Sequence, residues 1–454
     1  MVPGNMRPSI DRSNKSNRSV IKQKEYARRR RQLMRMAGED SIIILQAAPA
    51  KLRNNDVYFP YRQDSDFLYL TGFREHDALL VLVPGAGDGT SILFCRDRDP
   101  EREMWDGRMV GVEAAVSEYG MDEAYDIKQA EGRLRDLLQD RERIFHDLGR
   151  SPLFDQRLIG WLNEFRGETR KTFHAPEEIH ALDHMLHDMR VYKSREELST
   201  MRRSAKVAIE AHQQAMRICE PGINEADILA SLLHTFTRNH CEASYLPIVG
   251  GGANACVLHY IANNQELHDG DLLLIDAGAE LDGYASDITR TFPVNGKFSP
   301  EQKILYEVVL AAQEAAIEKA RAGNQWQDVH DAAIRVATEG MIALGILDGS
   351  LDEQLESKGY KQFCVHNTGH WLGLDVHDVG EYTIDGHSRE LEPGMVLTIE
   401  PGIYISPGAS SVKACWRGVG IRIEDNVAIT NDAPRILTEG LARTVDEIEA
   451  QMAA

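Results

Sequence analysis

Four acidic residues lie in apolar stretches, where a charge is costly to bury. Asp276 ends the run Leu-Leu-Leu-Ile-Asp, and Asp287 begins the segment that returns after an Asp-Gly turn. In the second half of the chain, Glu400 ends Val-Leu-Thr-Ile-Glu, and Glu424 lies within Gly-Ile-Arg-Ile-Glu-Asp. A carboxylate on a buried strand costs several kcal/mol unless another group neutralises it. The pattern therefore predicts positive charge facing both acidic pairs.

Arginines or metal ions could supply that charge. Arg290 and Arg422 lie near these acids in the sequence, but two arginines cannot balance four carboxylates. Two divalent cations can, and two ions bridged by carboxylates and a hydroxide form a standard hydrolytic arrangement. We therefore favour a dinuclear metal site and keep arginine-paired structural acids as the alternative.

A histidine-rich segment lies between the two acidic pairs. It reads Cys-Val-His-Asn-Thr-Gly-His-Trp-Leu-Gly-Leu-Asp-Val-His-Asp and contains His366, His370 and His377. A lone histidine is more often an ordinary core or surface residue, but three so close together favour a metal ligand among them. One imidazole with four carboxylates is an oxygen-rich donor set, which favours Mn²⁺ over the Cys and His sets of structural zinc.

The elements around these residues predict two domains. Up to about residue 180, short apolar runs alternate with helical patterns, which is typical of a mixed α/β domain, and Phe67 to Leu70 is one of the expected strands. Beyond residue 188, a plan of helix, helix and strands occurs twice. We expect a flexible tail over 1–20, an α/β domain over 21–187, and an α+β domain of duplicated ααββ halves around a cleft over 188–454.

Composition excludes several classes of protein. The 454 residues include 51 Lys and Arg against 71 Asp and Glu, a net charge of -20 that opposes binding to nucleic acid or an anionic membrane. A hydrophobic share of 43% is typical of globular domains, and no apolar run approaches the length of a membrane span. The scattered cysteines and the lack of an apolar leader predict a cytoplasmic protein. The basic amino-terminal residues leave a mitochondrial transit peptide as the alternative to a tail.

The motifs around the acids resemble those of the pita-bread metallopeptidases. They are Ile-Asp276-Ala-Gly-Ala-Glu, Ser-Asp287-Ile-Thr-Arg-Thr-Phe-Pro, His-Asn-Thr-Gly-His370-Trp-Leu-Gly, Glu-Pro-Gly-Met-Val-Leu-Thr-Ile-Glu400-Pro-Gly and Gly-Ile-Arg-Ile-Glu424-Asp. Five motifs in one order make the resemblance specific. Within the family the chain is most similar to the aminopeptidase P group, and the segment from Asp56 to Phe73 also resembles the first domain of that group.

The resemblance implies a role for each metal ligand. Asp287 and Glu424 would bridge two Mn²⁺ ions. Asp276 would chelate one ion, and His370 and Glu400 would bind the other. Glu400 would also relay the proton of the attacking water, a general-base role that suits a carboxylate beside the nucleophile.

The resemblance also implies contacts with substrate. His259, in Val-Leu-His-Tyr, and His377 would hold the substrate around the scissile bond, and His366 would line the same pocket. Tyr404 and Arg422 would steady the metal ligands from outside, as outer groups usually do.

Two residues of the first domain complete the implied site. Asp56 and Trp105 would shape substrate pockets, across a subunit boundary if the protein is an oligomer. By analogy we expect a homo-oligomer, a tetramer or a dimer.

The activity implied by the resemblance is release of the first residue from peptides with proline in second position, by a hydroxide that bridges two divalent cations. An Xaa-Pro dipeptidase shares every ligand and is the close alternative. A pita-bread binding protein without catalysis, and a metal-free amidinohydrolase on the same fold, are less favoured because both acidic pairs are intact.

Overall fold

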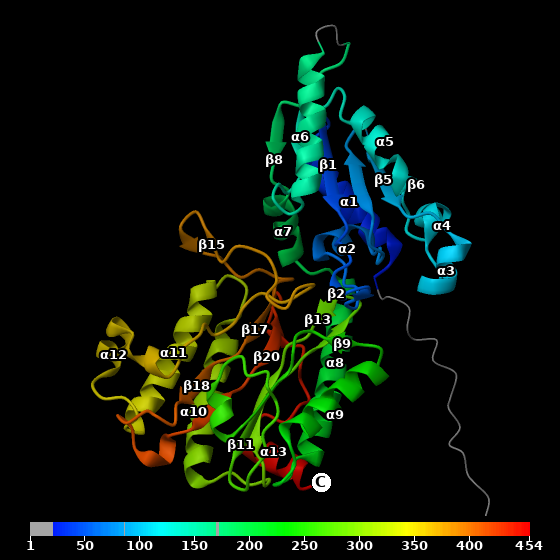
Figure 1. The fold of residues 1–454 in the computed structure, drawn as a ribbon. Helices are drawn as coiled ribbons and strands as arrows, with labels where there is room; N and C mark the ends of the chain where they lie inside the picture. The colour runs from blue at the N-terminus through cyan, green and yellow to red at the C-terminus, as the bar shows by residue number, and fades with distance from the viewer. Residues whose placement is uncertain (1–20, 86, 169–171) are drawn as a thin grey trace, which may run out of the picture.

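The computed structural model describes residues 21–85, 87–168 and 172–454 (Figure 1). The tail expected over 1–20 lies outside the described residues. Two bodies follow one another along the chain, a smaller one built around a single sheet and a larger one that holds the predicted acids (Figure 1).

The first body is an α/β domain around a six-stranded sheet of order β6-β5-β4-β1-β7-β8. Its strands are β1 (Ser41–Gln46), β4 (Leu79–Val83), β5 (Thr90–Cys95), β6 (Glu123–Asp126), β7 (Arg143–Phe145) and β8 (Glu178–His180). β1, β7 and β8 are parallel, as are β5 and β6, while β4 runs antiparallel to β1 and β5. The main helices are α1 (Gln23–Ala37), α5 (Ala130–Leu137) and α6 (Pro152–Gly167).

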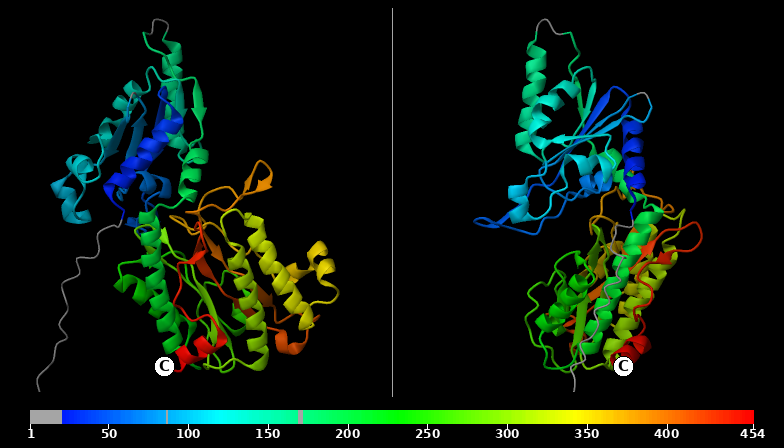
Figure 2. Two further views of the ribbon diagram at one scale, coloured as in Figure 1. Left: turned by 180° about the vertical axis from the view of Figure 1, so that it is seen from behind. Right: turned by 90° about the vertical axis from the view of Figure 1, so that its right-hand side faces the viewer.

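Helices cover both faces of this sheet, which explains why its strands are continuous apolar runs rather than alternating ones. Along β1, Ile43 and Leu45 pack in one hydrophobic core with Leu33 of α1. Ile42 and Ile44 pack in the opposite core with α5 and α6. Figure 2 shows the helices on either side of the sheet.

The expected strand from Phe67 to Leu70 is wrong, because these residues lie in a helix, α2 (Ser65–Thr71). Asp64 caps this helix by accepting a hydrogen bond from Phe67 N at 2.9 Å. Every residue of α2 is buried. The segment Phe67 to Leu70 therefore has no polar residue that would mark an exposed helical face, and its hydrophobicity lacks a helical period.

The connection between the bodies is helical. α7 (Asp183–Val191) runs across the boundary expected between residues 187 and 188, which stays a prediction. The remaining elements of the first body are β2 (Leu52–Asn54), β3 (Val57–Tyr58), α3 (Pro100–Asp106) and α4 (Gly111–Ser117).

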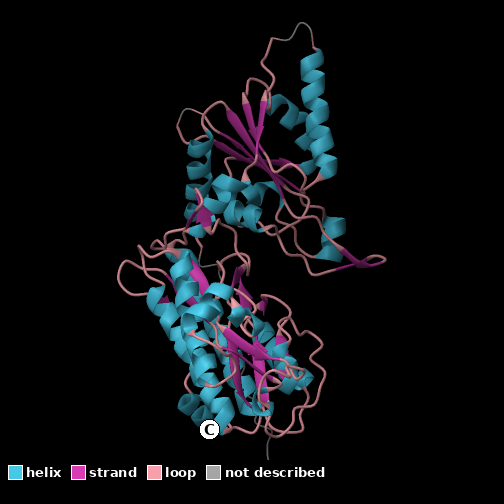
Figure 3. Cartoon of the chain, turned by 90° about the vertical axis from the view of Figure 1, so that its left-hand side faces the viewer, coloured by secondary structure: helices cyan, strands magenta, loops and turns pink. Residues whose placement is uncertain are grey.

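The second body repeats a helix, helix, strands plan, as the sequence predicts (Figure 3). Its first half contains α8 (Arg195–Ile218), α9 (Glu225–Arg238), β9 (Glu242–Ala243), β10 (Ile248–Gly251), β11 (Leu272–Asp276), β12 (Ala279–Leu281), β13 (Tyr284–Ala285) and β14 (Thr289–Pro293). Its second half contains α10 (Pro300–Lys319), α11 (Trp326–Ala343), α12 (Leu351–Ser357), β15 (Thr383–Ile384), β16 (His387–Ser388), β17 (Val396–Ile399), β18 (Gly402–Ile405), β19 (Val419–Arg422), β20 (Asp425–Ala428), β21 (Arg435–Ile436) and α13 (Val445–Met452).

Local chemistry sets the start of each half. Ser194 opens α8 and Ser299 opens α10, each in a capping box that satisfies free N–H groups of the first helical turn. The strands β10-β11-β14 and β17-β20-β21 form the sheets behind which the paired helices pack. Among the described residues, none of the helices has the combination of length and apolarity needed to cross a bilayer.

Candidate metal centre and active site

The two halves of the second body bring the four predicted acids together. Asp276 is the last residue of β11, and Asp287 lies just before β14, which pairs with β11. Glu400 follows β17 and Glu424 precedes β20, and the register of this strand pair places the two glutamates opposite each other. The Glu424 N–H donates to Thr289 O at 3.1 Å, which joins the two halves at this point.

His370 is the histidine that faces the acids. Its Nε2 lies 3.5 Å from Asp287 Oδ2 and 3.4 Å from Glu400 Oε1. Its Nδ1 lies 2.9 Å from Trp371 O, so the N–H on Nδ1 donates to that carbonyl and Nε2 is the nitrogen that would face a metal. Ligand atoms of Asp287, His370 and Glu424 all lie within 4.8 Å of one another.

The cluster has more negative charge than its surroundings neutralise. Burial raises the pKa of Glu424 well above its usual value, and the neighbouring carboxylates raise it further. Burial also raises the pKa of Asp276, and it raises that of Glu400 to about 7. Burial would lower the pKa of His370, but Asp287 and Glu400 raise it to about 9. Burial is the largest cause of the shifts at the acids, and neighbouring carboxylates add to each of them; bound cations would relieve both effects.

Arginine does not balance this charge. Arg422 donates to Asp276 Oδ2 at 2.6 Å, but Arg290 binds Asp425 Oδ1 at 2.8 Å and the Glu424 carbonyl oxygen at 2.6 Å. In the described part of the chain, no arginine or lysine pairs with Asp287, Glu400 or Glu424, and Glu424 Oε1 is buried without a hydrogen-bond donor. Four carboxylates and one imidazole with such an orphaned oxygen fit hard divalent cations, and the arginine-paired alternative does not fit.

Tyr245 is a residue of this cluster that sequence reasoning missed. Its hydroxyl lies within hydrogen-bond distance of both Asp276 Oδ1 and Asp287 Oδ1. It reaches them because β9, just before it, pairs with β12, which lies between the two aspartates. No local pattern marks this tyrosine, since the contact depends on strand pairing.

A chain of polar side chains runs from His366 to the metal cluster. His366 Nε2 lies 2.8 Å from the Tyr404 hydroxyl, and that hydroxyl accepts a hydrogen bond from Arg422 at 2.8 Å. Arg422 in turn donates to Asp276. Burial and the Arg422 charge lower the pKa of His366 to about 4, so this imidazole is neutral and accepts from Tyr404.

The other two predicted histidines are exposed beside this chain. The ring of His377 lies edge-on to that of His370, with centroids 4.3 Å apart. His259 lies near enough that its charge would lower the pKa of both His366 and His377, in addition to the larger effect of burial. The structure therefore places His259, His366 and His377 close to one another beside the acids.

Asp56 and Trp105 are not brought to the cluster within one chain. Asp56 lies in the turn between β2 and β3, and Trp105 lies on α3 with 89% of its surface exposed. The β2–β3 hairpin projects from the first body, away from β11 and β17 (Figure 2).

Family models match both bodies. Residues 199–431 match metallopeptidase family M24, and residues 26–145 match the aminopeptidase P N-terminal domain. The chain belongs to metallopeptidase family M24. The resemblance to aminopeptidase P is confirmed, and so is the fold class, an α/β domain followed by a pita-bread catalytic domain.

Relatives of this M24 protein match it over nearly its whole length. It is 42% identical to the Xaa-Pro aminopeptidase of Escherichia coli K12 over 440 residues, which are 96% of this chain and 99% of that one. A solved structure of Pseudomonas aeruginosa aminopeptidase PepP is similar with a TM-score of 0.93 and 50% identity, over 95% of this chain and 98% of that one. Zinc-substituted E. coli aminopeptidase P in complex with product gives a TM-score of 0.92 and 42% identity, over 95% of this chain and 98% of that one.

Proposed function

We propose that this M24 metallopeptidase releases the first residue from peptides whose second residue is proline. The observation that carries the proposal is the buried group of four carboxylates and one imidazole with only one paired arginine. Similarity to Xaa-Pro aminopeptidases over nearly the full chain supports the choice of substrate.

Five residues would hold two divalent cations: Asp276, Asp287, His370, Glu400 and Glu424. We favour Mn²⁺, because oxygen donors dominate the set. Such ions, when bound, lower the pKa of a water molecule and polarise a carbonyl oxygen.

The protein's own residues would supply the remaining chemistry. Glu400 is placed to accept the proton of the attacking water, because its carboxylate is part of the cluster and faces the cleft histidine His366, with Nδ1 and Oε2 3.9 Å apart. His259 and His377 would donate hydrogen bonds to substrate oxygens from the open side. Tyr404 and Arg422 would keep the cluster in shape, since they bind Asp276 and His366 together.

A proline requirement has a physical basis in the substrate itself. The peptide bond before proline has no N–H, so a peptidase that depends on this donor cannot hold it. A site that grips a carbonyl oxygen and a free amine needs no such donor.

The test compares an Xaa-Pro-Xaa tripeptide with the corresponding Xaa-Pro dipeptide, each with Mn²⁺ and with a chelator. We expect kcat/KM to favour the tripeptide and activity to disappear with the chelator. Strong preference for the dipeptide would instead assign the chain as an Xaa-Pro dipeptidase. No activity and no bound metal would support a binding protein.

We also propose that the protein is a homo-oligomer in which the projecting hairpin and α3 reach a neighbouring cleft. Large apolar side chains are exposed on these two elements: Leu52, Val57, Tyr58, Phe59, Met104 and Trp105. A monomer rarely exposes so many together. In such an assembly Asp56 and Trp105 would complete the partner's substrate pocket. Light scattering after size-exclusion chromatography tests the assembly, and a monomeric wild-type mass would refute it.

The cytoplasm is the compartment we propose. All six cysteines are free, and four of them are buried: Cys95, Cys219, Cys241 and Cys364. Unpaired thiols are typical of a reducing compartment. Fractionation of cells that express the full chain tests this proposal.

A further inference from the structure

The loop after His370 leaves a histidine exposed beside the metal cluster and buries the acid that follows it. His377 is exposed, and within the described residues its imidazole has no hydrogen-bond partner. Asp378, the next residue, has a side chain that is only 1% exposed. Because no side-chain hydrogen bond orients His377, its position depends on how the backbone around Asp378 is held.

Two cations from the connection between the bodies hold that backbone. Arg190 on α7 donates to Asp378 Oδ1 at 2.5 Å, and Lys193 Nζ donates to Asp378 Oδ2 at 2.9 Å. Arg190 also donates to Asp375 Oδ2 at 2.7 Å and to Asp66 Oδ1 of α2 at 2.7 Å. We name these five residues the joint cluster. One guanidinium thus links the first domain to acids on both sides of His377.

The loop packs closely around this cluster. A Cβ at Gly373 would lie 2.1 Å from Asp378 Oδ2, and one at Gly380 would lie 2.3 Å from Val191. The Asp378 N–H donates to Trp371 O at 2.9 Å. Burial would raise the pKa of Asp378, but Lys193 and Arg190 lower it, so the acid is charged and fully paired. The segment therefore has little freedom to move while the pairs are intact.

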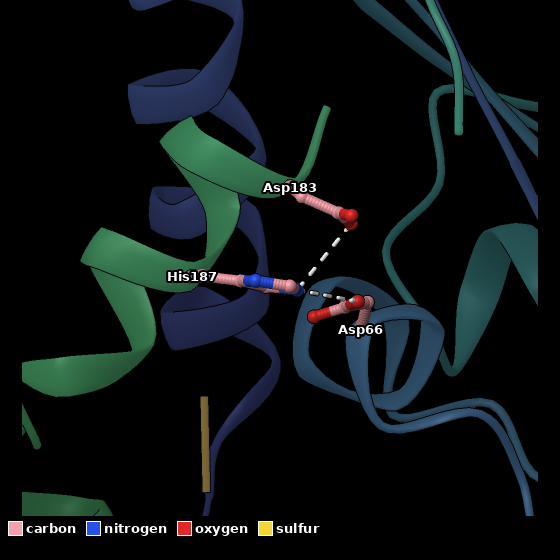
Figure 4. A group of neighbouring side chains, drawn as sticks. All are labelled: Asp66, Asp183 and His187. Carbon is pink, nitrogen blue, oxygen red and sulfur yellow. Dashed lines mark ion pairs between the residues drawn. The ribbon is translucent and has the colours of Figure 1, made fainter. Parts of the chain in front are cut away.

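At the Asp66 end of the joint cluster, side chains of the protein also supply positive charge to the carboxylates. His187 Nε2 lies 3.4 Å from Asp66 Oδ2 and 3.4 Å from Asp183 Oδ1 (Figure 4). These three side chains have a spacing that a metal could use. However, Arg150 donates to the same two oxygens, at 3.2 Å and 3.1 Å. Arginine already supplies the positive charge here, so we assign this group to the joint between domains and not to an ion.

We propose that Arg190, on the helix that connects the two bodies, is a positioning residue that sets the place of His377 beside the metal cluster. The inference rests on the proposed function, in which His377 contacts the substrate. Arg190 holds Asp375 and Asp378 as a rigid pair, so the two residues between them, of which His377 is the second, are kept at one position beside the cluster. A displacement of about 1 Å in a substrate-positioning group can cost about a hundredfold in rate.

The experiment compares Arg190→Lys with His377→Ala and with the double variant. Lysine keeps the positive charge, which favours folding over a neutral substitution, but its single ammonium nitrogen does not reproduce the planar fork with which Arg190 reaches Asp66 through Nη1 and Asp375 and Asp378 through Nη2. Three quantities are measured: kcat and KM on an Xaa-Pro-Xaa tripeptide with Mn²⁺, metal content, and the rate at which diethyl pyrocarbonate modifies His377, read by mass spectrometry.

A matched control comes from another buried arginine between the domains. Arg29 on α1 pairs with Glu197 of α8 at 3.0 Å, and its side chain is 0% exposed. It does not contact the loop of His377. Arg29→Lys therefore weakens another buried contact between the domains and leaves the contacts of Arg190 with Asp375 and Asp378 intact. If the variants act only by loosening the domains, both should show the same loss.

We expect Arg190→Lys to lower kcat/KM about 10- to 100-fold with metal content unchanged, and Arg29→Lys to stay within about twofold of wild type. The kcat/KM of the double variant should be no lower than that of His377→Ala, because both substitutions disrupt the same function of His377. The His377 modification rate should change in Arg190→Lys only. Additive losses in the double variant, loss of metal, or equal effects of the two arginine variants would each overturn the proposal. If wild type does not cleave the tripeptide, the proposed function fails, and the modification rate still decides the positioning.

Discussion

The metal centre and the joint cluster both bury several carboxylates, yet they are neutralised in different ways. At the joint, Asp66 and Asp378 are each paired with arginine or lysine of the chain at 2.9 Å or less. At the centre, within the described part of the chain, only Asp276 has such a partner, while Glu424 has an orphaned oxygen. Buried acids with cations from the chain are part of the fold, whereas buried acids without them mark a place for ions from outside.

The largest expected effect is on activity at the centre. Asp287→Asn or Glu424→Gln should nearly abolish turnover, because each removes a carboxylate that we propose bridges both ions. Steady-state kinetics with Mn²⁺ and metal analysis measure this. A residual kcat above about a tenth of wild type, which is under ~1.4 kcal/mol of barrier, would contradict the role.

Neutralising one acid should lower the free energy of unfolding of the metal-free protein at the joint cluster, but not at the metal centre. Asp378→Asn leaves Arg190 and Lys193 with a buried charge that is no longer balanced, and should cost about 3 to 5 kcal/mol of unfolding free energy. Glu424→Gln removes repulsion among acids and should not destabilise the metal-free protein. Urea unfolding after treatment with a chelator measures both. Equal destabilisation would remove the distinction between the two regions.

A substitution at His377 should affect turnover without affecting metal binding. His377→Ala should lower kcat/KM about 10- to 100-fold and leave metal content unchanged, because the imidazole is close to His370 but lies outside the proposed ligand set. Parallel metal analysis is the control. Loss of the ions in this variant would make His377 a ligand.

The smallest effect is a pH dependence of opposite sign at two histidines, the buried His212 and the half-buried His187. Burial lowers the pKa of His212 to about 4, so the neutral form is native, and its contribution to stability is lost as the pH falls below the ordinary value of 6.5. This should cost about 1 kcal/mol between pH 7 and pH 5.5. At the joint, burial would lower the pKa of His187, but Asp66 raises it, so its contribution is full at low pH and lost as the pH rises.

The variants His212→Gln and His187→Gln test this contrast by urea unfolding across that pH range. Glutamine at 212 can still donate to Ala277 O, which His212 Nε2 contacts at 3.0 Å. We expect His212→Gln to flatten the loss of stability on acidification, and His187→Gln to steepen it. The same slope in both variants and wild type would assign the pH dependence to other groups.

Much of the centre could be predicted because its signals are local. Asp276 and Glu400 end apolar runs, and their neighbours form motifs that identify the family. Tyr245 could not be predicted, because its contact with two aspartates depends on the pairing of β9 with β12. Arg190 could not be predicted either, since its partners Asp66 and Asp378 are 124 and 188 residues away in the chain.

The fold, like the site, could be predicted only where its signals are local in the sequence. The duplicated plan of the second body follows from capping residues and apolar periods, which are local. The sequence predicts a strand in place of α2, because a completely buried helix has no exposed polar face from which its period could be recognised. The predicted domain boundary depends on where the pattern of elements changes along the sequence, and α7 continues through it without a break.

The continuity of α7 also bears on how a peptide enters. Only Tyr192, Lys193 and Ser194 separate α7 from α8, and Lys193 is buried with its amine on Asp378. A hinge between the domains would have to bend at these residues and break that ion pair. The short connection and its buried ion pair therefore oppose opening of the two bodies about a hinge at these residues.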